Sequence, residues 1–221
     1  MQRINLRLPL ALILLLILAA ATASCVKKVA TDDFDEGSID NSTSTYSNKY
    51  LGFSLTLPKT WLLQDSQTQR MVTDAGKKMV TGNNKALRDA YNESMVNNHM
   101  LLTLFKHPVS EAVDFNPSFI VQAEKISPAL HIEKGSDYIE QARKTMESGS
   151  MKLPFKDSGS ENLGGAVFDK AEATYPLGKI TIKQRIYATI RKGYAVSIIT
   201  TLVSDEDEAT VDGILKSVKF M

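Results

Sequence analysis

The stretch KITIKQRIYATIR, from Lys179 to Arg191, alternates isoleucine or alanine with charged, hydroxylated or aromatic residues. A period of two is the side-chain period of a β-strand. Residues 166–175 precede this strand through the turn 176–178, and the apolar run 194–203 follows it after Lys192-Gly193, which predicts a three-stranded meander. Because the run 194–203 is apolar on both faces, we expect it at the centre of an antiparallel sheet.

One face of the 179–191 strand predicts a candidate binding surface. We expect its isoleucines to be buried and the opposite face to be wet and basic. That face carries a row that we call the basic strip: Lys183, Arg185, Tyr187 and Arg191. Side chains at alternate positions stand about 7 Å apart, which suits an acidic partner protein, an anionic glycan or a lipid headgroup. The alternative is a solvated face, or a face covered by a helix through the aliphatic stems.

The basic strip leads to a specific expectation. If these side chains face water and bind a partner, Lys183→Glu combined with Arg185→Glu should abolish capture of that partner. The same double substitution should leave the thermal midpoint nearly unchanged, because exposed side chains contribute little to stability.

The remaining periodic segments predict an α+β fold. We expect strands at 51–57, 99–106 and 118–126, and helices at 66–98, 136–148 and from Ser204 onward, the first of them interrupted around Gly82-Asn83-Asn84. Trp61, the only tryptophan, is expected to close one end of the core. The order of strand, helices, two strands, helix, three strands and helix is typical of an antiparallel sheet with helices packed on it.

Several motifs resemble the Mog1/PsbP-like superfamily. They are Tyr50-x-x-Gly52-Phe53-Ser54-Leu55-x-Leu57-Pro58-x-x-Trp61, Leu163-Gly164-Gly165, Gly193-Tyr194 and Val218-Lys219-Phe220. The similarity covers about residues 46–221 and implies a PsbP/DcrB-type domain, an α-β-α sandwich whose central antiparallel sheet is flanked by helices. Members of the superfamily include photosystem II extrinsic subunits, a Ran-binding nuclear import factor and bacterial envelope lipoproteins. The resemblance therefore implies a fold without fixing a function, and no member's binding residues carry over.

The first 25 residues predict an export signal that ends at a lipidation site. Two arginines precede an apolar run over residues 8–21, which is shorter than the roughly 20 residues of a membrane-spanning helix. The segment Ala21-Thr22-Ala23-Ser24-Cys25 resembles the lipobox of bacterial lipoproteins. That resemblance implies cleavage between Ser24 and Cys25 and diacylation of Cys25.

An acylated Cys25 would anchor the chain, because two acyl chains hold a soluble domain stably on a bilayer. The alternative is an ordinary secretory signal cut after Ala21 or Ala23, which leaves the only cysteine as an unpaired thiol. The next residues are rich in Thr, Ser, Asn and acid, with few large apolar side chains to offset the entropy of ordering. We therefore divide the chain into a signal peptide (1–24), a lipidated N-terminus with a disordered tether (25–48) and a folded domain (49–221).

The charge balance argues against a nucleic-acid-binding protein. The whole chain has 26 basic and 25 acidic residues. Removal of the signal would take away two arginines and leave 24 basic against 25 acidic residues, a net charge of −1. Binding to nucleic acid needs a basic surface that displaces counterions from phosphate. We therefore expect no nucleic acid among the partners.

No motif for catalysis or metal binding stands out in the sequence. His99, His107 and His131 lie on separate segments without metal-ligand spacing, so we expect structural or surface roles for them. Leu163-Gly164-Gly165 lacks the lysine of a P-loop. The run Asp205-Glu206-Asp207-Glu208 would attract a cation, but capping of a helix explains it more simply. We expect no catalytic residue, no metal and no cofactor.

These observations predict a lipoprotein of the bacterial cell envelope that is anchored to a membrane through Cys25. We favour the outer membrane, with the domain facing the periplasm, over the inner membrane. The anchor and the packing motifs favour a non-enzymatic binding or assembly module, whose expected partners are the membrane and an envelope protein. The alternative is an envelope enzyme of hydrolase type with residues that converge only in the fold. A pocket holding a histidine or carboxylate pair would favour the enzyme.

Overall fold

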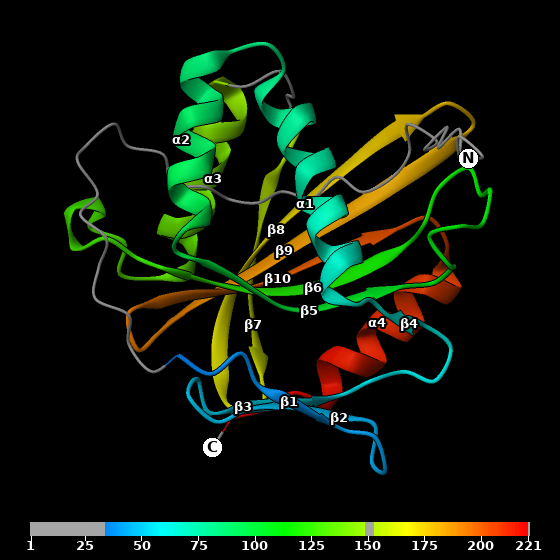
Figure 1. Ribbon diagram of the computed structural model, residues 1–221. Helices are drawn as coiled ribbons and strands as arrows, with labels where there is room; N and C mark the ends of the chain where they lie inside the picture. The colour runs from blue at the N-terminus through cyan, green and yellow to red at the C-terminus, as the bar shows by residue number, and fades with distance from the viewer. Residues whose placement is uncertain (1–33, 149–152, 221) are drawn as a thin grey trace.

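The structure, a computed structural model, describes residues 34–148 and 153–220 (Figure 1). Its helices are α1 (Ser66–Thr81), α2 (Lys85–Met95), the 3₁₀ turn η1 (Pro128–Leu130), α3 (Gly135–Ser148) and α4 (Asp205–Ser217). Its strands are β1 (Ser38–Asp40), β2 (Thr45–Asn48), β3 (Phe53–Thr56), β4 (Leu62–Leu63), β5 (Asn98–Phe105), β6 (Ser118–Lys125), β7 (Lys156–Leu163), β8 (Ala166–Leu177), β9 (Ile180–Arg191), β10 (Tyr194–Leu202) and β11 (Lys219–Phe220).

A seven-stranded antiparallel sheet forms the middle of the molecule. Its strand order is β4-β5-β6-β10-β9-β8-β7. The predicted meander is confirmed, since β8, β9 and β10 are consecutive neighbours. Strand β10 lies at the centre, and every one of its residues is buried. A strand with neighbours on both sides and layers on both faces needs apolar residues throughout, which explains the run in the sequence.

Each face of this sheet is covered by a different layer (Figure 1). Helices α1, α2 and α3 cover one face, where Ile199 of β10 is buried among their apolar side chains. A small sheet of order β1-β2-β3-β11 and helix α4 cover the other face, where Ile198 is buried. The predicted α+β sandwich around an antiparallel sheet is therefore confirmed. The second layer differs from the expectation in combining one helix with a sheet.

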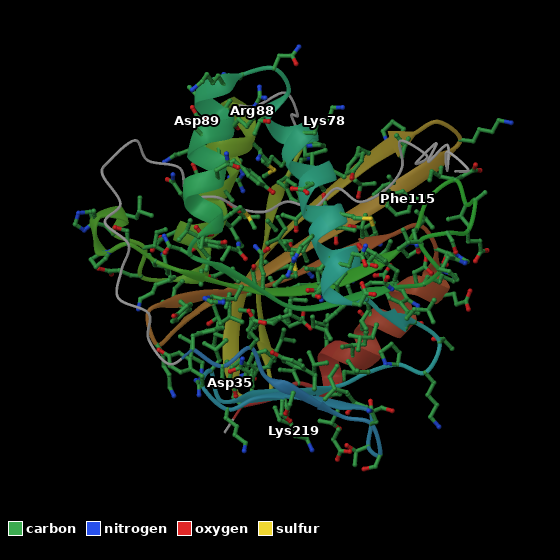
Figure 2. All side chains as sticks on the ribbon, viewed as in Figure 1. Asp35, Lys78, Arg88, Asp89, Phe115 and Lys219 are labelled. Atoms are coloured by element: carbon green, nitrogen blue, oxygen red, sulfur yellow. The ribbon has the colours of Figure 1, made fainter. Side chains whose placement is uncertain are left out.

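The helices begin and end where the sequence indicates. The Asp65 side chain accepts from the Thr68 backbone N–H at 2.7 Å at the start of α1, and Gly82, with φ of 50°, ends it. Figure 2 shows Lys78, Arg88 and Asp89 at the end of the α1–α2 hairpin that points away from the sheet. Trp61 is buried in the core, as predicted.

The prediction of a disordered tether over residues 25–48 is wrong for residues 34–48. These residues form β1 and β2, and β2 pairs with both β1 and β3. Tyr46 is buried, and its hydroxyl donates to the Glu36 carbonyl at 2.6 Å. The polar composition of this segment wrongly indicated disorder. A four-residue strand needs only one or two buried side chains once its backbone is hydrogen-bonded on both edges. Residues 25–33 lie outside the described residues.

The sequence does not predict strand β7. Its sequence, KDSGSENL, is exposed at every position except the last. Strand β7 lies at the edge of the large sheet. Both faces of this edge strand are exposed to solvent, so its sequence does not alternate between apolar and polar residues. The sequence therefore gives no indication that the segment pairs with β8.

Asn48 offers a test of the ordered start of the domain. Its fully buried side chain donates to the Asp35 carbonyl at 2.7 Å and accepts from the Leu51 N–H at 2.7 Å. We expect Asn48→Ala to lower the free energy of unfolding by about 2 kcal/mol, because two buried hydrogen bonds are lost. Asn41→Ala, in the exposed turn after β1, should change it by less than about 0.5 kcal/mol. Urea unfolding measures both, and equal values would contradict the ordered segment.

Candidate functional site

A pocket of about 250 Å³ opens beside α4 on the face of the large sheet that α4 covers. We call it the α4 pocket. Side chains from β7, β8, β9 and α4 line it: Glu161, Lys170, Arg185, Tyr187, Glu208, Asp212, Leu215 and Lys216. Three of these are cationic and three are anionic, so the pocket carries both signs of charge in equal number.

The structure places two residues of the basic strip at this pocket, but it does not leave them exposed. Arg185 is 8% exposed and Tyr187 only 1%. Helix α4 begins 14 residues after the end of β9 and packs over this face, so the expectation of a wet basic face is wrong. The alternative in which a helix covers the strip is correct.

Three carboxylates surround the Arg185 guanidinium. Its Nε lies 2.8 Å from Glu172 on the neighbouring strand β8, and one terminal nitrogen pairs with Glu208 of α4. The other terminal nitrogen lies 3.6 Å from Asp212, one helical turn further along α4. Burial alone would lower the pKa of Arg185, but its hydrogen bonds to Glu172 and Glu208 outweigh burial and raise it. Arg185 therefore joins β8, β9 and α4 as a permanent cation.

The two ends of the basic strip make other contacts. Lys183 pairs with Glu208 at 2.8 Å, and its side chain is 37% exposed. Arg191 donates from Nε to the Leu51 carbonyl at 2.5 Å and lies 4.7 Å from the centre of the Phe220 ring. The four residues thus fasten α4 and the small sheet to the large sheet, and they do not present a continuous surface to a partner.

Tyr187 forms the floor of the α4 pocket. Burial raises the pKa of its phenol to about 12, so the hydroxyl stays protonated at neutral pH and is a hydrogen-bond donor. Lys170, directly opposite on β8, holds its ammonium group 5.7 Å from the centre of the Tyr187 ring. Lys170, Lys216 and Glu161 form no ion pair within the described part of the chain, so their charges are available at the pocket rim.

The pocket contains a carboxylate pair, Glu208 and Asp212, of the kind that would favour a hydrolase. Both carboxylates face Arg185, and Glu208 also accepts from Lys183. The hydrogen bond from Lys183, with help from Arg185, lowers the pKa of Glu208. A general acid needs a raised pKa so that it holds a proton near neutral pH. This arrangement favours ionic binding over acid–base catalysis.

The sequence did not reveal five of the pocket residues, which come from three elements besides β9. Lys170 lies opposite Tyr187 in the register of β8 and β9, and this pairing was the one available signal. Glu161 lies on the missed strand β7. The α4 residues Asp212 and Lys216 are separated by one helical turn, but nothing in their spacing indicates which strand they face.

The histidines are not brought together. The Nδ1 atom of His99 lies 3.6 Å from Glu36, that of His107 lies 3.6 Å from Glu111, and His131 is exposed after η1. His99 is the second residue of β5, whereas His107 lies two residues after its end. Among residues 34–148 and 153–220, no group of three or more His, Cys, Asp or Glu side chains has the arrangement of a metal site.

The acidic run at 205–208 caps α4, as predicted. The Ser204 hydroxyl accepts from the Asp207 N–H at 3.2 Å. Asp207 is buried, accepts from the Val203 N–H and pairs with Lys106 at 2.8 Å. The hydrogen bond that the Lys106 ammonium donates to Asp207 raises the pKa of Lys106. These carboxylates are thus used in capping and in internal ion pairs.

The predicted cleavage and lipidation residues, Ser24 and Cys25, lie outside the described residues. Lipidation therefore stays a prediction. Within residues 34–148 and 153–220, no helix is long and apolar enough to span a bilayer.

Comparisons with known proteins find similar folds at low sequence identity. No family model matches the chain, and no curated protein matches it. A cyanobacterial PsbP from Synechocystis is 13% identical with a TM-score of 0.47, over 84% of this chain and 98% of that one. LpqN of Mycobacterium tuberculosis, involved in cell envelope biogenesis, is 15% identical with a TM-score of 0.38, over 76% of this chain and 83% of that one.

A third solved structure, from Bacteroides thetaiotaomicron, is 13% identical with a TM-score of 0.38. The match covers 77% of this chain but only 45% of the Bacteroides protein, so this chain spans less than half of it.

Proposed function

We propose that this chain is a lipid-anchored protein of the bacterial envelope that binds a partner through the α4 pocket and performs no catalysis. The proposal is supported by the distribution of charge in the pocket, where, among the described residues, the charges at the base are paired with one another and those at the rim are not. Arg185, Glu208 and Asp212 neutralise one another at the base, while Lys170 and Lys216 remain at the rim. Such a pocket fits a charged peptide segment that presents both signs, because each partner charge meets an opposite one.

The anchor would keep the pocket near the membrane. Only the eight residues 26–33 separate Cys25 from Phe34, the first residue of the described domain. Eight residues span at most about 29 Å when fully extended. The domain would therefore meet partners in or beside the same membrane, where their effective concentration is high.

Photocrosslinking in intact cells tests both parts of the proposal. Lys216, exposed at the pocket rim, is replaced by the crosslinking residue p-benzoylphenylalanine, and in a matched control Lys179, exposed in the turn between β8 and β9, is replaced instead. We expect discrete protein adducts from position 216 and none from position 179. Adding Cys25→Ser should move the chain from the carbonate-washed membrane pellet to the soluble fraction and reduce the adducts at least about tenfold.

The two parts fail separately. If the Cys25→Ser chain stays in the washed pellet, the lipid anchor is refuted, whatever the crosslinks show. If positions 216 and 179 give the same adducts, the α4 pocket is not the contact surface, even when the anchor holds.

A further inference from the structure

Strand β7 forms an edge of the large sheet beside the α4 pocket. It is the last strand in the sheet order, and among the described strands it pairs only with β8. Residues 156–162 are all exposed, so the N–H and C=O groups that point away from β8 face solvent. A row of such backbone groups at a sheet edge is a template on which another strand can pair.

The two halves of β7 differ. In the first half, Asp157 pairs with Arg143 of α3 at 2.7 Å, and the register with β8 shifts between Asp157 and Ser160. Gly159, with φ of 87°, lies in this bulge. From Ser160 to Leu163 the pairing with β8 is regular. A bulge twists an edge strand away from further pairing, so the regular second half is the part of the edge that can accept another strand.

The side chains of this second half connect the edge to the α4 pocket. Glu161 is opposite Phe168, which is buried on the α4 side of the sheet. Directly opposed residues point to the same face, so Glu161 lies on that side too, where it lines the pocket. Asn162 points to the other face, opposite Val167, whose side chain is 60% exposed. An added strand would therefore lie beside an anion on one face and near an exposed valine on the other.

We infer that the partner of the α4 pocket binds by β-strand addition, an inference that rests on the proposed function. An extended segment of the partner pairs with Ser160–Leu163 as an eighth strand of the large sheet and places a lysine or arginine opposite Glu161. In this binding mode backbone hydrogen bonds supply the affinity, and side chains at alternate positions supply the specificity. Neighbouring strands lie about 4.8 Å apart, so a basic side chain opposite Glu161 reaches its carboxylate. The residues before and after the basic one face the side of Val167 and are apolar.

Titration with the acetylated and amidated peptide Ser-Val-Lys-Val-Ser tests this mode of binding, with NMR of the backbone amides of the full chain in detergent micelles. We expect saturable shifts of the Ser160–Asn162 amides with a Kd on the order of 1 mM. Leu62 and Leu63 of β4, at the opposite edge of the same sheet, are the control and should not shift. The peptide with glutamate in place of lysine should bind at least about threefold more weakly. Glu161→Lys should reverse the order of the two peptides.

Two N-methylated peptides test the backbone hydrogen bonds. One carries methyl groups on both valine nitrogens, and the other carries them on the nitrogens of the lysine and the second serine. The N–H groups of a strand point alternately to its two edges, so only one of these sets faces β7. We expect one peptide to bind at least about tenfold more weakly than the parent peptide and the other to bind within about threefold of it. Equal binding of the two would mean that side chains alone hold the peptide, and strand addition would be refuted.

Other results would overturn strand addition and leave the proposed function intact. If the Ser160–Asn162 amides do not shift, or if those of β4 shift equally, the edge of β7 accepts no specific strand, whereas discrete adducts from position 216 would still support the α4 pocket. If light scattering finds a dimer that Glu161→Lys converts to a monomer, β7 pairs with a second copy of this chain and not with a partner segment.

Discussion

Replacing Arg185 by alanine is expected to lower the free energy of unfolding by about 3 to 5 kcal/mol. Arg185 is buried, and its guanidinium faces Glu172, Glu208 and Asp212. Without it, these carboxylates would face one another across β8 and α4 with no cation at the centre. Removal of one partner from a buried ion pair costs this much because the other charge is left uncompensated.

Lys183→Ala is the matched control, because Lys183 pairs with the same Glu208. Its side chain is 37% exposed, and water replaces a partly exposed ion pair at a cost of up to about 1 kcal/mol. Urea unfolding of the two variants measures the difference. If both variants lost the same free energy of unfolding, Arg185 would be as solvated as Lys183, and the basic strip would be exposed after all.

The Arg185 effect should depend on pH. The hydrogen bond from Lys183, followed by that from Arg185, lowers the pKa of Glu208 in the folded state. A carboxylate with a lowered folded pKa stabilises the fold above its unfolded pKa, and this stabilisation is lost as the pH falls through the folded pKa. The difference between the unmodified chain and Arg185→Ala should therefore shrink below about pH 4.

The sequence predicted the elements whose signal is local. Strand β10 was recognisable because all nine of its residues are buried, and α4 because Ser204 and the acids after it cap a helix wherever it packs. The break between α1 and α2 followed from Gly82, whose positive φ is open to glycine at no steric cost. Such signals depend on residues within one turn or one strand.

The candidate site could not be predicted because it depends on what packs against a known face. The alternation in β9 correctly grouped Arg185 with Tyr187, but a period of two says nothing about whether water or a helix covers that group. If the basic strip were exposed, Lys183→Glu combined with Arg185→Glu would leave the thermal midpoint nearly unchanged. With Arg185 buried among three carboxylates, that substitution should instead unfold much of the population.

Gly135→Ala is expected to lower the free energy of unfolding by about 3 kcal/mol, because α3 begins in direct contact with β9. A Cβ on Gly135 would lie 1.9 Å from the Ala188 carbonyl oxygen and 2.6 Å from its carbon. Both atoms belong to the backbone of a strand inside the sheet, so neither yields as a side chain would. The start of α3 must shift instead, which also strains the hydrogen bond from the Ser136 N–H to Asp169, at 2.7 Å. Overpacking of this kind costs up to about 3 kcal/mol, and occasionally more.

Gly213→Ala is the control, because it makes the same chemical change in an open position. Gly213 lies within α4, and apart from its chain neighbours and the adjoining backbone of its own helix no described atom lies within 4 Å of where its Cβ would be. Alanine is favoured over glycine inside a helix by about 0.5 to 1 kcal/mol, so this variant should be slightly more stable than the unmodified chain. Urea unfolding should therefore shift in opposite directions for the two variants. If Gly135→Ala were also neutral or stabilising, α3 would not rest on the β9 backbone, and the helical layer on this face of the large sheet would have to be placed differently.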